Sequence, residues 1–344
     1  MAERNRTRLL VALVGIAIAM LLVARFVIRK EAREEPELDD GEALLLDTTT
    51  IALPSSFAPG ASGASGAASA APRHARYESA LISTRIDGLS SGAGTALAVG
   101  EGGTILRYEI EHPTWRSEAS PTRSELRAVA QQLDEAIAVG DDGVIAERDE
   151  SGNWTLAAPV TKRTLRAVVY SSYGAIAVGD GGTIVRRVAR HEPWRVEPSA
   201  TTRDLFGACS GLRDVWVVGA GGAVLSRTID AWNMQTIGAA DWLAVACDDR
   251  GGLAVGKAGA MIARSADVAW HDVPSGVTSD LFAVSAPIGT RSFLVVGASG
   301  TVLHVAGAAS AEPASFDVAL RAVSEGALGT WVAGDAGIFR RVPE

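Results

Sequence analysis

The segment AVGDGGTIVR, at Ala177–Arg186, decides the fold because its pattern returns along the chain. Each copy has an apolar run, a glycine, two variable residues, a second glycine and another apolar run. The first glycine occurs seven times, at Gly100, Gly140, Gly179, Gly219, Gly256, Gly297 and Gly334. Successive positions are 40, 39, 40, 37, 41 and 37 residues apart. A period of about 40 in a chain of short apolar strands is typical of the blades of a β-propeller.

Two apolar runs joined by Gly-x-x-Gly predict a β-hairpin in every copy. We expect a type I turn followed by a residue with positive φ, which glycine adopts without strain. That residue is the second glycine of each copy: Gly103, Gly143, Gly182, Gly222, Gly259, Gly300 and Gly337. A phosphate-binding loop is the alternative for a glycine-rich motif, but such a loop leads into a helix. Because every copy here leads into an apolar strand, the glycines are predicted to be structural.

Residues 76–344 accommodate four strands per repeat. They predict an all-β domain, a seven-bladed β-propeller with four-stranded antiparallel blades. The innermost strand carries a Leu-x-Ala-Val phrase, as at Leu126–Val129, and the outermost strand carries a large aromatic residue. The last repeat ends without a fourth strand, whereas a spare strand, Arg76–Leu81, precedes the first, so this N-terminal strand is predicted to close the last blade. The aromatic residues, which we expect to pack between blades, are Trp115, Trp154, Trp194, Trp232 and Trp270.

The chain begins with a basic tail, residues 1–8, and an apolar run at residues 9–28. Twenty helical residues rise about 30 Å, enough to span a bilayer, so we expect an N-terminal transmembrane helix that stays in place as an anchor. A cleaved signal peptide is the alternative, but Leu22-Val23-Ala24 is a poor cleavage signal. Residues 29–75 are acidic and then rich in Gly, Ala and Ser, which is typical of a flexible linker. The basic tail ahead of the apolar run favours a propeller outside the cytoplasm, periplasmic or extracellular.

The order Val-Gly-x-x-Gly-x-Ile-x-Arg, a turn and then Trp resembles the photosystem II stability/assembly factor family and its relatives with bacterial neuraminidase (BNR) repeats. The resemblance covers residues 76–344 and implies a propeller. These families carry an Asp-box, Ser-x-Asp-x-Gly-x-Thr-Trp, in the turn before the Trp. Here the box is eroded, and the nearest match, Asp149–Trp154, has its glycine one place late. The resemblance therefore predicts a fold and assigns no activity.

A sialidase-like glycoside hydrolase is the first alternative function. Such an enzyme needs three arginines that bind the substrate carboxylate, a Tyr–Glu pair and an acid Asp. The sequence lacks the Arg-Ile-Pro signature of these enzymes, which Arg85-Ile86-Asp87 only approaches. The four tyrosines fall in the closing strand, a blade strand and one hairpin loop. No catalytic residue is assigned, although paired carboxylates at glycosidase spacing stay open.

The sequence gives little support for a metal site, a nucleic-acid-binding site or a reactive thiol. The five histidines lack the close spacing of metal ligands, so we assign no metal and no cofactor. A net charge of −8, without a basic stripe interleaved with aromatics, predicts no binding of nucleic acid. Cys209 and Cys247 occupy corresponding points of neighbouring repeats. We expect two buried free thiols there, with a disulfide as the alternative, since equivalent strands match disulfide geometry poorly.

The second position of the Leu-x-Ala-Val phrase divides the ring into a charged arc and an apolar arc. Around the ring it reads Arg321, Asp87, Arg127, Arg166, Phe206, Leu243 and Phe282. The Gly-x-x-Gly turns are expected on the same rim, where they add acidic residues to the charged arc. One interpretation is structural, with Asp87 paired to the arginines of neighbouring blades and the phenylalanines packed as core. The other is a polarised mouth for a partner's loop or tail, with Asp87, Arg127, Arg166, Arg321, Phe206 and Phe282 as binding residues.

The predicted function is that of a membrane-tethered, non-enzymatic β-propeller, a protein-binding or assembly scaffold outside the cytoplasm. Its predicted partners are an unidentified protein and, through residues 9–28, the membrane. The alternatives are a degenerate sialidase-like glycoside hydrolase and a purely structural surface protein. The feature that distinguishes the scaffold hypothesis from the hydrolase hypothesis is a cluster of converging acids and arginines at the mouth.

Overall fold

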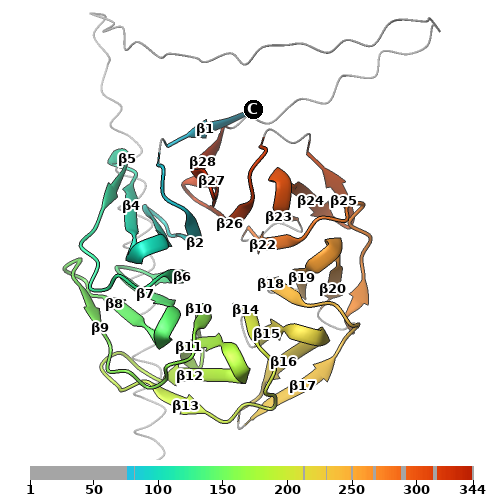
Figure 1. Ribbon diagram of the computed structural model, residues 1–344, viewed down its shortest axis with the longest axis horizontal. Coiled ribbons are helices and arrows are strands. Elements are labelled where there is room, and N and C mark those ends of the chain that lie inside the picture. Colours follow the sequence, from blue (N-terminus) through green and yellow to red (C-terminus); the bar gives the residue numbers. More distant parts are fainter. Residues whose placement is uncertain are drawn as a thin grey trace, which may run out of the picture. The chain divides into compact units, whose positions relative to one another are not determined.

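Seven four-stranded sheets follow one another around a ring (Figure 1). The computed structural model describes residues 76–80, 82–211, 214–229, 231–248, 251–265, 269–287, 292–312 and 316–342. The fold is the seven-bladed, all-β propeller predicted from the repeats. The predicted basic tail, transmembrane helix and linker, residues 1–75, lie outside the described residues. In the described part of the chain, no helix is long and apolar enough to cross a membrane.

Each blade is an antiparallel meander from the centre of the ring outward. The innermost strands of blades 1 to 7 are β2 (Ile86–Ser91), β6 (Leu126–Gln132), β10 (Leu165–Ser171), β14 (Leu205–Ser210), β18 (Trp242–Cys247), β22 (Leu281–Ser285) and β26 (Leu320–Gly326). The second strands are β3 (Thr95–Gly100), β7 (Glu135–Gly140), β11 (Gly174–Gly179), β15 (Val215–Gly219), β19 (Gly251–Gly256), β23 (Phe293–Gly297) and β27 (Gly329–Gly334). The third strands are β4 (Ile105–Glu109), β8 (Ile145–Arg148), β12 (Thr183–Arg187), β16 (Ala223–Arg227), β20 (Met261–Ser265), β24 (Val302–Ala306) and β28 (Gly337–Val342). The outermost strands are β5 (His112–Ser117), β9 (Trp154–Leu156), β13 (Arg195–Glu197), β17 (Trp232–Thr236), β21 (His271–Asp272), β25 (Ala308–Ala311) and, in blade 7, β1 (Arg76–Ser79).

The two ends of the blades form two different faces. Leu126, at the start of β6, pairs with Gly140, the last residue before the turn to the third strand. The innermost strands therefore begin on the face that carries these turns, which we call the turn face. The rear face, opposite, carries the hairpins that join first to second and third to fourth strands. In blades 1 to 6 the turns are the short 3-10 segments η1 (Glu101–Gly103), η2 (Asp141–Gly143), η3 (Asp180–Gly182), η4 (Ala220–Gly222), η5 (Lys257–Gly259) and η6 (Ala298–Gly300).

The seven turn glycines have positive φ, as predicted, from 67° at Gly300 to 103° at Gly337. The predicted turn type is wrong in blades 1 to 6, because the preceding residue also has positive φ, as at Gly102 (64°). The Thr104 N–H closes this turn on the carbonyl oxygen of Glu101 at 3.1 Å. Two successive left-handed residues make a type I′ turn, whose twist matches that of the flanking strands.

The N-terminal strand closes the ring, as predicted. β1 pairs antiparallel with β28 over all four of its residues. The Ala80 N–H then donates to the Ile338 carbonyl at 2.9 Å and prolongs the pairing. The last blade thus takes its outermost strand from the N-terminal end of the propeller and its other three strands from the C-terminal end. The third strand, β28, therefore has no free edge.

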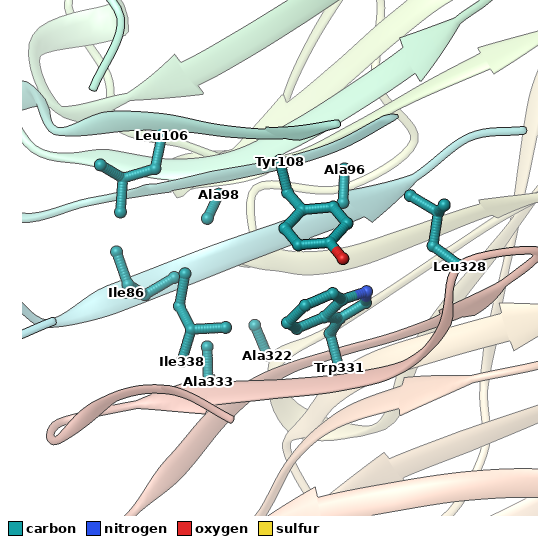
Figure 2. Close-up of a cluster of buried hydrophobic side chains, with 10 residues drawn as sticks. All are labelled: Ile86, Ala96, Ala98, Leu106, Tyr108, Ala322, Leu328, Trp331, Ala333 and Ile338. Carbon is teal, nitrogen blue, oxygen red and sulfur yellow. The ribbon is translucent and has the colours of Figure 1, made fainter. Parts of the chain in front are cut away.

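The hydrophobic core lies between neighbouring blades. At the junction of blades 7 and 1, Tyr108 on β4 packs on Trp331 on β27 with ring centroids 4.8 Å apart (Figure 2). Ile86 and Ile338 fill the same cluster and are 0% exposed. Side chains from two sheets thus share each cluster, so a blade is stable only beside its neighbours.

Buried arginines and tryptophans bind neighbouring blades through shared glutamates. The Trp154 indole N–H donates to Glu118 of the preceding blade at 2.5 Å, and Arg148 Nη2 donates to the same carboxylate at 3.0 Å. The tryptophans are inter-blade core, as predicted, but their polar partners were missed. The overlooked signal is an arginine five to seven residues before the Trp. The arrangement recurs in Trp194, Arg187 and Glu147, and in Trp232, Arg227 and Glu197.

The expectation of two free thiols is wrong, because Cys209 and Cys247 form a disulfide between β14 and β18. Their Cα atoms are 5.6 Å apart, within the usual range for a disulfide. The physical reason is the close approach of these two innermost strands. A Cβ atom on Gly207 would lie 2.9 Å from the Ala244 Cα, so only glycine allows that spacing.

Candidate functional site at the propeller mouth

The second residues of the seven innermost strands line one hollow of about 190 Å³ at the turn face, which we call the mouth. This confirms that these positions share one rim. The following residue of each strand also lines the hollow and is always Gly or Ala. The mouth is therefore a shallow cup, rimmed by Asp87, Arg127, Arg166, Phe206, Leu243, Phe282 and Arg321.

A β-bulge at the start of each innermost strand turns these side chains into the mouth. In β6 the pairing passes from Leu126 opposite Gly140 to Ala128 opposite Val139, so Arg127 is the extra residue. The same shift occurs in all seven blades. A bulge leaves one residue unpaired and redirects its side chain. Simple alternation along a strand does not predict that redirection.

Three arginines of the charged arc are held by aspartates on the turns of their own blades. Arg127 Nε donates to Asp141 Oδ1 at 2.7 Å and Nη2 donates to Oδ2 at 3.1 Å. The hydrogen bond from Arg127 lowers the pKa of the Asp141 carboxyl below its usual value. The equivalent Nε bonds, from Arg166 to Asp180 and from Arg321 to Asp335, both measure 2.5 Å.

These pairs orient the guanidinium groups without burying them. The side chains of Arg127, Arg166 and Arg321 are 31%, 32% and 36% exposed. Each aspartate occupies the Nε–Nη2 edge, and a guanidinium group has five N–H donors. In Arg166 and Arg321 the donors on the far side of the group therefore stay directed away from the aspartate, where a bound molecule can reach them. In Arg127 the far-side Nη1 lies 3.2 Å from Glu125 Oε1.

Asp87 differs from the other members of the charged arc. Its Oδ2 accepts a hydrogen bond from Arg85 at 3.2 Å, and its Oδ1 lies 3.9 Å from Arg321 Nε. Burial raises the pKa of Asp87, although Arg85 opposes the shift. The structural interpretation, in which Asp87 pairs with neighbouring arginines, holds for Arg321. It is wrong for Arg127 and Arg166, which pair within their blades.

The apolar arc consists of Phe206, Leu243 and Phe282, which are half-buried. Arginines of the charged arc contact both of its ends. The guanidinium carbon of Arg166 lies 5.4 Å from the Phe206 ring centroid, and that of Arg321 lies 5.7 Å from the Phe282 centroid. Both distances are in the range of cation–π attraction. The two arcs thus meet in defined contacts, and the apolar side chains are not closed core.

Aspartates from following blades hold the turns of blades 3 to 5. Each lies just before an innermost strand and accepts the backbone N–H of the second turn residue in the preceding blade. These residues were missed, although an Asp directly before the Leu or Trp that opens a strand was a visible signal. The bonds run from Gly181 to Asp204, from Gly221 to Asp241 and from Ala258 to Asp280, at 2.7, 2.8 and 2.8 Å.

The tyrosines lie away from the mouth. Tyr170 and Tyr173 lie at the hairpin between β10 and β11 on the rear face. Tyr108 belongs to the core cluster of blades 7 and 1, and Tyr77 lies on the closing strand. The three mouth arginines therefore have no tyrosine beside them that could act as a sialidase nucleophile. Within the described residues, no group of three His, Cys, Asp or Glu side chains could hold a metal ion.

Comparison with known proteins supports the fold. No family model and no curated protein matches the chain. The solved structure of YCF48 bound to D1 peptide matches with a TM-score of 0.64 and 12% identity, over 79% of this chain and 96% of that one. YCF48 from Cyanidioschyzon merolae matches with a TM-score of 0.62 and 15% identity, over 77% of this chain and 98% of that one. At such identities the likeness establishes a shared propeller fold.

Proposed function

We propose that this chain is a membrane-tethered, non-enzymatic β-propeller that acts as a protein-binding or assembly scaffold outside the cytoplasm. Its partner-binding site is the mouth, which receives a loop or tail of another protein. The observation that carries the proposal is the division of the mouth into an arc of oriented arginines and an arc of half-buried apolar side chains.

A polypeptide segment suits both arcs of the mouth at once. Its carbonyl or carboxylate oxygens can accept from the guanidinium donors, while its apolar side chains cover Phe206, Leu243 and Phe282. Full burial of one such side chain contributes about 1.5–3 kcal/mol. The hollow of about 190 Å³ is smaller than the roughly 300–1,000 Å³ of small-molecule sites. A shallow cup of this kind favours a protruding loop or tail over a small molecule.

Two further observations support parts of the proposal. A propeller of the same fold, YCF48, has been solved bound to D1 peptide, so this architecture can hold a peptide. The disulfide between Cys209 and Cys247 is of a kind that persists in oxidising compartments and is rare in the cytosol. It supports a propeller outside the cytoplasm, and the apolar run at residues 9–28 supports a tether.

A photo-crosslinker in the mouth tests this function. Leu243, at the middle of the apolar arc, is replaced by p-benzoylphenylalanine in the full chain, and native membranes are irradiated. We expect one dominant adduct, joined to a loop or terminal segment of the partner when the product is mapped by mass spectrometry. The same residue at Gln235, exposed on the outermost strand β17, is the control. A Leu243 adduct pattern no different from that at Gln235 would contradict the proposal and favour a purely structural protein.

A further inference from the structure

The rear face contains a cleft between blades 2 and 3, remote from the mouth. One hollow of about 380 Å³ lies among the β6–β7 hairpin, the β10–β11 hairpin and the loop after β12. A second hollow of about 480 Å³ lies against the β8–β9 loop and shares Glu135, Arg187 and Arg190 with the first. We call the two hollows together the rear cleft. Each has the size of an ordinary binding pocket.

The rear cleft has an excess of negative charge. Its arginines are already paired: Arg148 with Glu118, Arg187 with Glu147, and Arg190 with both Glu135 and Glu150. Hydrogen bonds from the backbone around Asn153 lower the pKa of Asp149, which keeps that carboxylate ionised. Six carboxylates against three guanidinium groups leave a net charge of about −3 for a bound group to neutralise. The carboxylates are Asp134, Glu135, Glu147, Asp149, Glu150 and Glu192.

Leu133 at the rim of the cleft is unfavourable for the fold in two ways. Its side chain is 93% exposed, and its φ is 55°, in the left-handed region. Bulky residues rarely adopt that conformation, and such strain is concentrated at functional sites. Val188, 53% exposed, lies on the same hollow. Together the two side chains offer an apolar surface next to the carboxylates.

The Tyr170 hydroxyl is an unpaired polar group at the same place. Tyr170 lines the first hollow, and in the described part of the chain its oxygen has no hydrogen-bond partner. Burial raises the pKa of this hydroxyl to about 12, so it stays protonated. A buried hydroxyl without a partner costs free energy that an entering donor or acceptor would recover.

We propose that the rear cleft binds a cationic segment of a partner protein, with a Lys or Arg side chain among the carboxylates and a neighbouring apolar side chain on Leu133 and Val188. The cationic side chain donates to the exposed carboxylates of Asp134, Glu150 and Glu192, and a rotation of the Tyr170 side chain on binding brings its buried hydroxyl to an N–H of the segment. This second site is independent of the mouth, because it lies on the other face and has the opposite charge preference.

Binding of a defined peptide tests the proposal. The probe is the rhodamine-labelled, amidated peptide GLKLRG, titrated by fluorescence anisotropy against the full chain in detergent micelles, with GLELEG as the acidic counterpart. We expect GLKLRG to bind at least about tenfold more tightly than GLELEG. The combined variant Asp134→Asn, Glu150→Gln and Glu192→Gln should weaken GLKLRG binding about tenfold. Leu133→Gly should also weaken it about tenfold, yet melt at the parental temperature or above because the strain at φ 55° is relieved.

Two matched variants show where the probe binds. The variant Glu109→Gln, Glu111→Gln and Asp214→Asn makes the same charge change on the same face outside the cleft, and should bind GLKLRG as the parent does. The variant with the three mouth arginines replaced by Gln keeps the parental affinity if the cleft is the site. It binds the cationic probe more tightly if the probe lies at the mouth, because three positive charges are removed there. The proposal would be overturned if the two peptides bound equally, or if the cleft variants bound GLKLRG as tightly as the parent. It would also be overturned if the matched charge variant lost as much affinity for GLKLRG as the combined cleft variant.

Discussion

At the scale of single residues, neighbouring left-handed positions in one turn have different requirements. Gly102 and Gly103 both have positive φ, at 64° and 74°. A Cβ atom on Gly102 would have no atom within 4 Å, whereas one on Gly103 would lie 2.2 Å from the Thr122 carbonyl oxygen. The second glycine therefore recurs in all seven repeats, while the first of these two positions also admits Asp142, Ala258 and Ser299.

A pair of alanine substitutions separates backbone strain from this close contact. Gly102→Ala should lower the free energy of unfolding by about 1–2 kcal/mol, the cost of the left-handed conformation. Gly103→Ala adds an overlap with backbone and should lower it by about 3 kcal/mol or more. Urea unfolding followed by tryptophan fluorescence measures both. Equal costs would show that the contact with Thr122 is not what selects glycine.

At the scale of single elements, the closing strand is held by side chains as well as by its ladder. The Tyr77 hydroxyl on β1 donates to Glu312, which lies between blades 6 and 7, at 3.0 Å. Arg341 Nη2 donates to the same carboxylate at 2.5 Å, and His304 Nε2 is a further close partner. One carboxylate thus joins the outermost strand of the last blade to the blade before it.

Truncation tests ring closure. A chain without residues 1–72 keeps β1 and should fold into a soluble propeller with one cooperative melting transition. A chain without residues 1–83 exposes the edge of β28 and should aggregate, because an unpaired strand edge is a template for further strands. Light scattering and calorimetry distinguish the two. If both chains melted at the same temperature and stayed monomeric, β1 would not be what closes the ring.

The carboxylate that holds the closing strand should make stability depend on pH. Burial alone would raise the pKa of Glu312, but the hydrogen bond from His304 and the charge of Arg341 outweigh it, so the pKa lies below its usual value. A lowered pKa gives stability that is present above the unfolded-state value, about 4.3, and is lost as the pH falls through the folded-state value.

Glu312→Gln should therefore lower the free energy of unfolding at pH 7 and flatten its fall between about pH 5 and pH 3. Urea midpoints at pH 7, 5, 4 and 3 provide the measurement. Glu78→Gln, an exposed residue on the same closing strand, is the control and should keep the parental slope. A Glu312→Gln variant as acid-sensitive as its parent would show that this carboxylate does not govern the acid response.

At the scale of the whole molecule, the features that sequence predicts are those encoded locally. The spacing of the glycines was enough to predict seven blades, and the spare strand Arg76–Leu81 was enough to predict how the ring closes. The Arg–Asp pairs of the mouth were not predicted, although an Asp fourteen residues after Arg127, Arg166 and Arg321 was there to be read. The bulges that aim these arginines depend on strand register, which the apolar pattern does not specify.

Two features formed between different blades were beyond the reach of sequence. The disulfide depends on how closely β14 and β18 approach, which Gly207 against Ala244 decides. The rear cleft depends on hairpins from two blades, about 40 residues apart in the chain, meeting at one face. Neither property is local, so the sequence pattern could not distinguish free thiols from a disulfide, nor place Leu133 beside Val188.

The central claim is that the mouth arginines serve a partner and not the fold. Replacing Arg127, Arg166 and Arg321 by Gln removes five partly exposed ion pairs, each worth about 0.2–1 kcal/mol, so the melting temperature should fall by only about 5 °C. In the same variant, the adduct formed from p-benzoylphenylalanine at Leu243 should disappear. A triple variant that unfolds as readily as Gly103→Ala would contradict the claim, as would one that melts near its parent and forms the adduct at the parental yield.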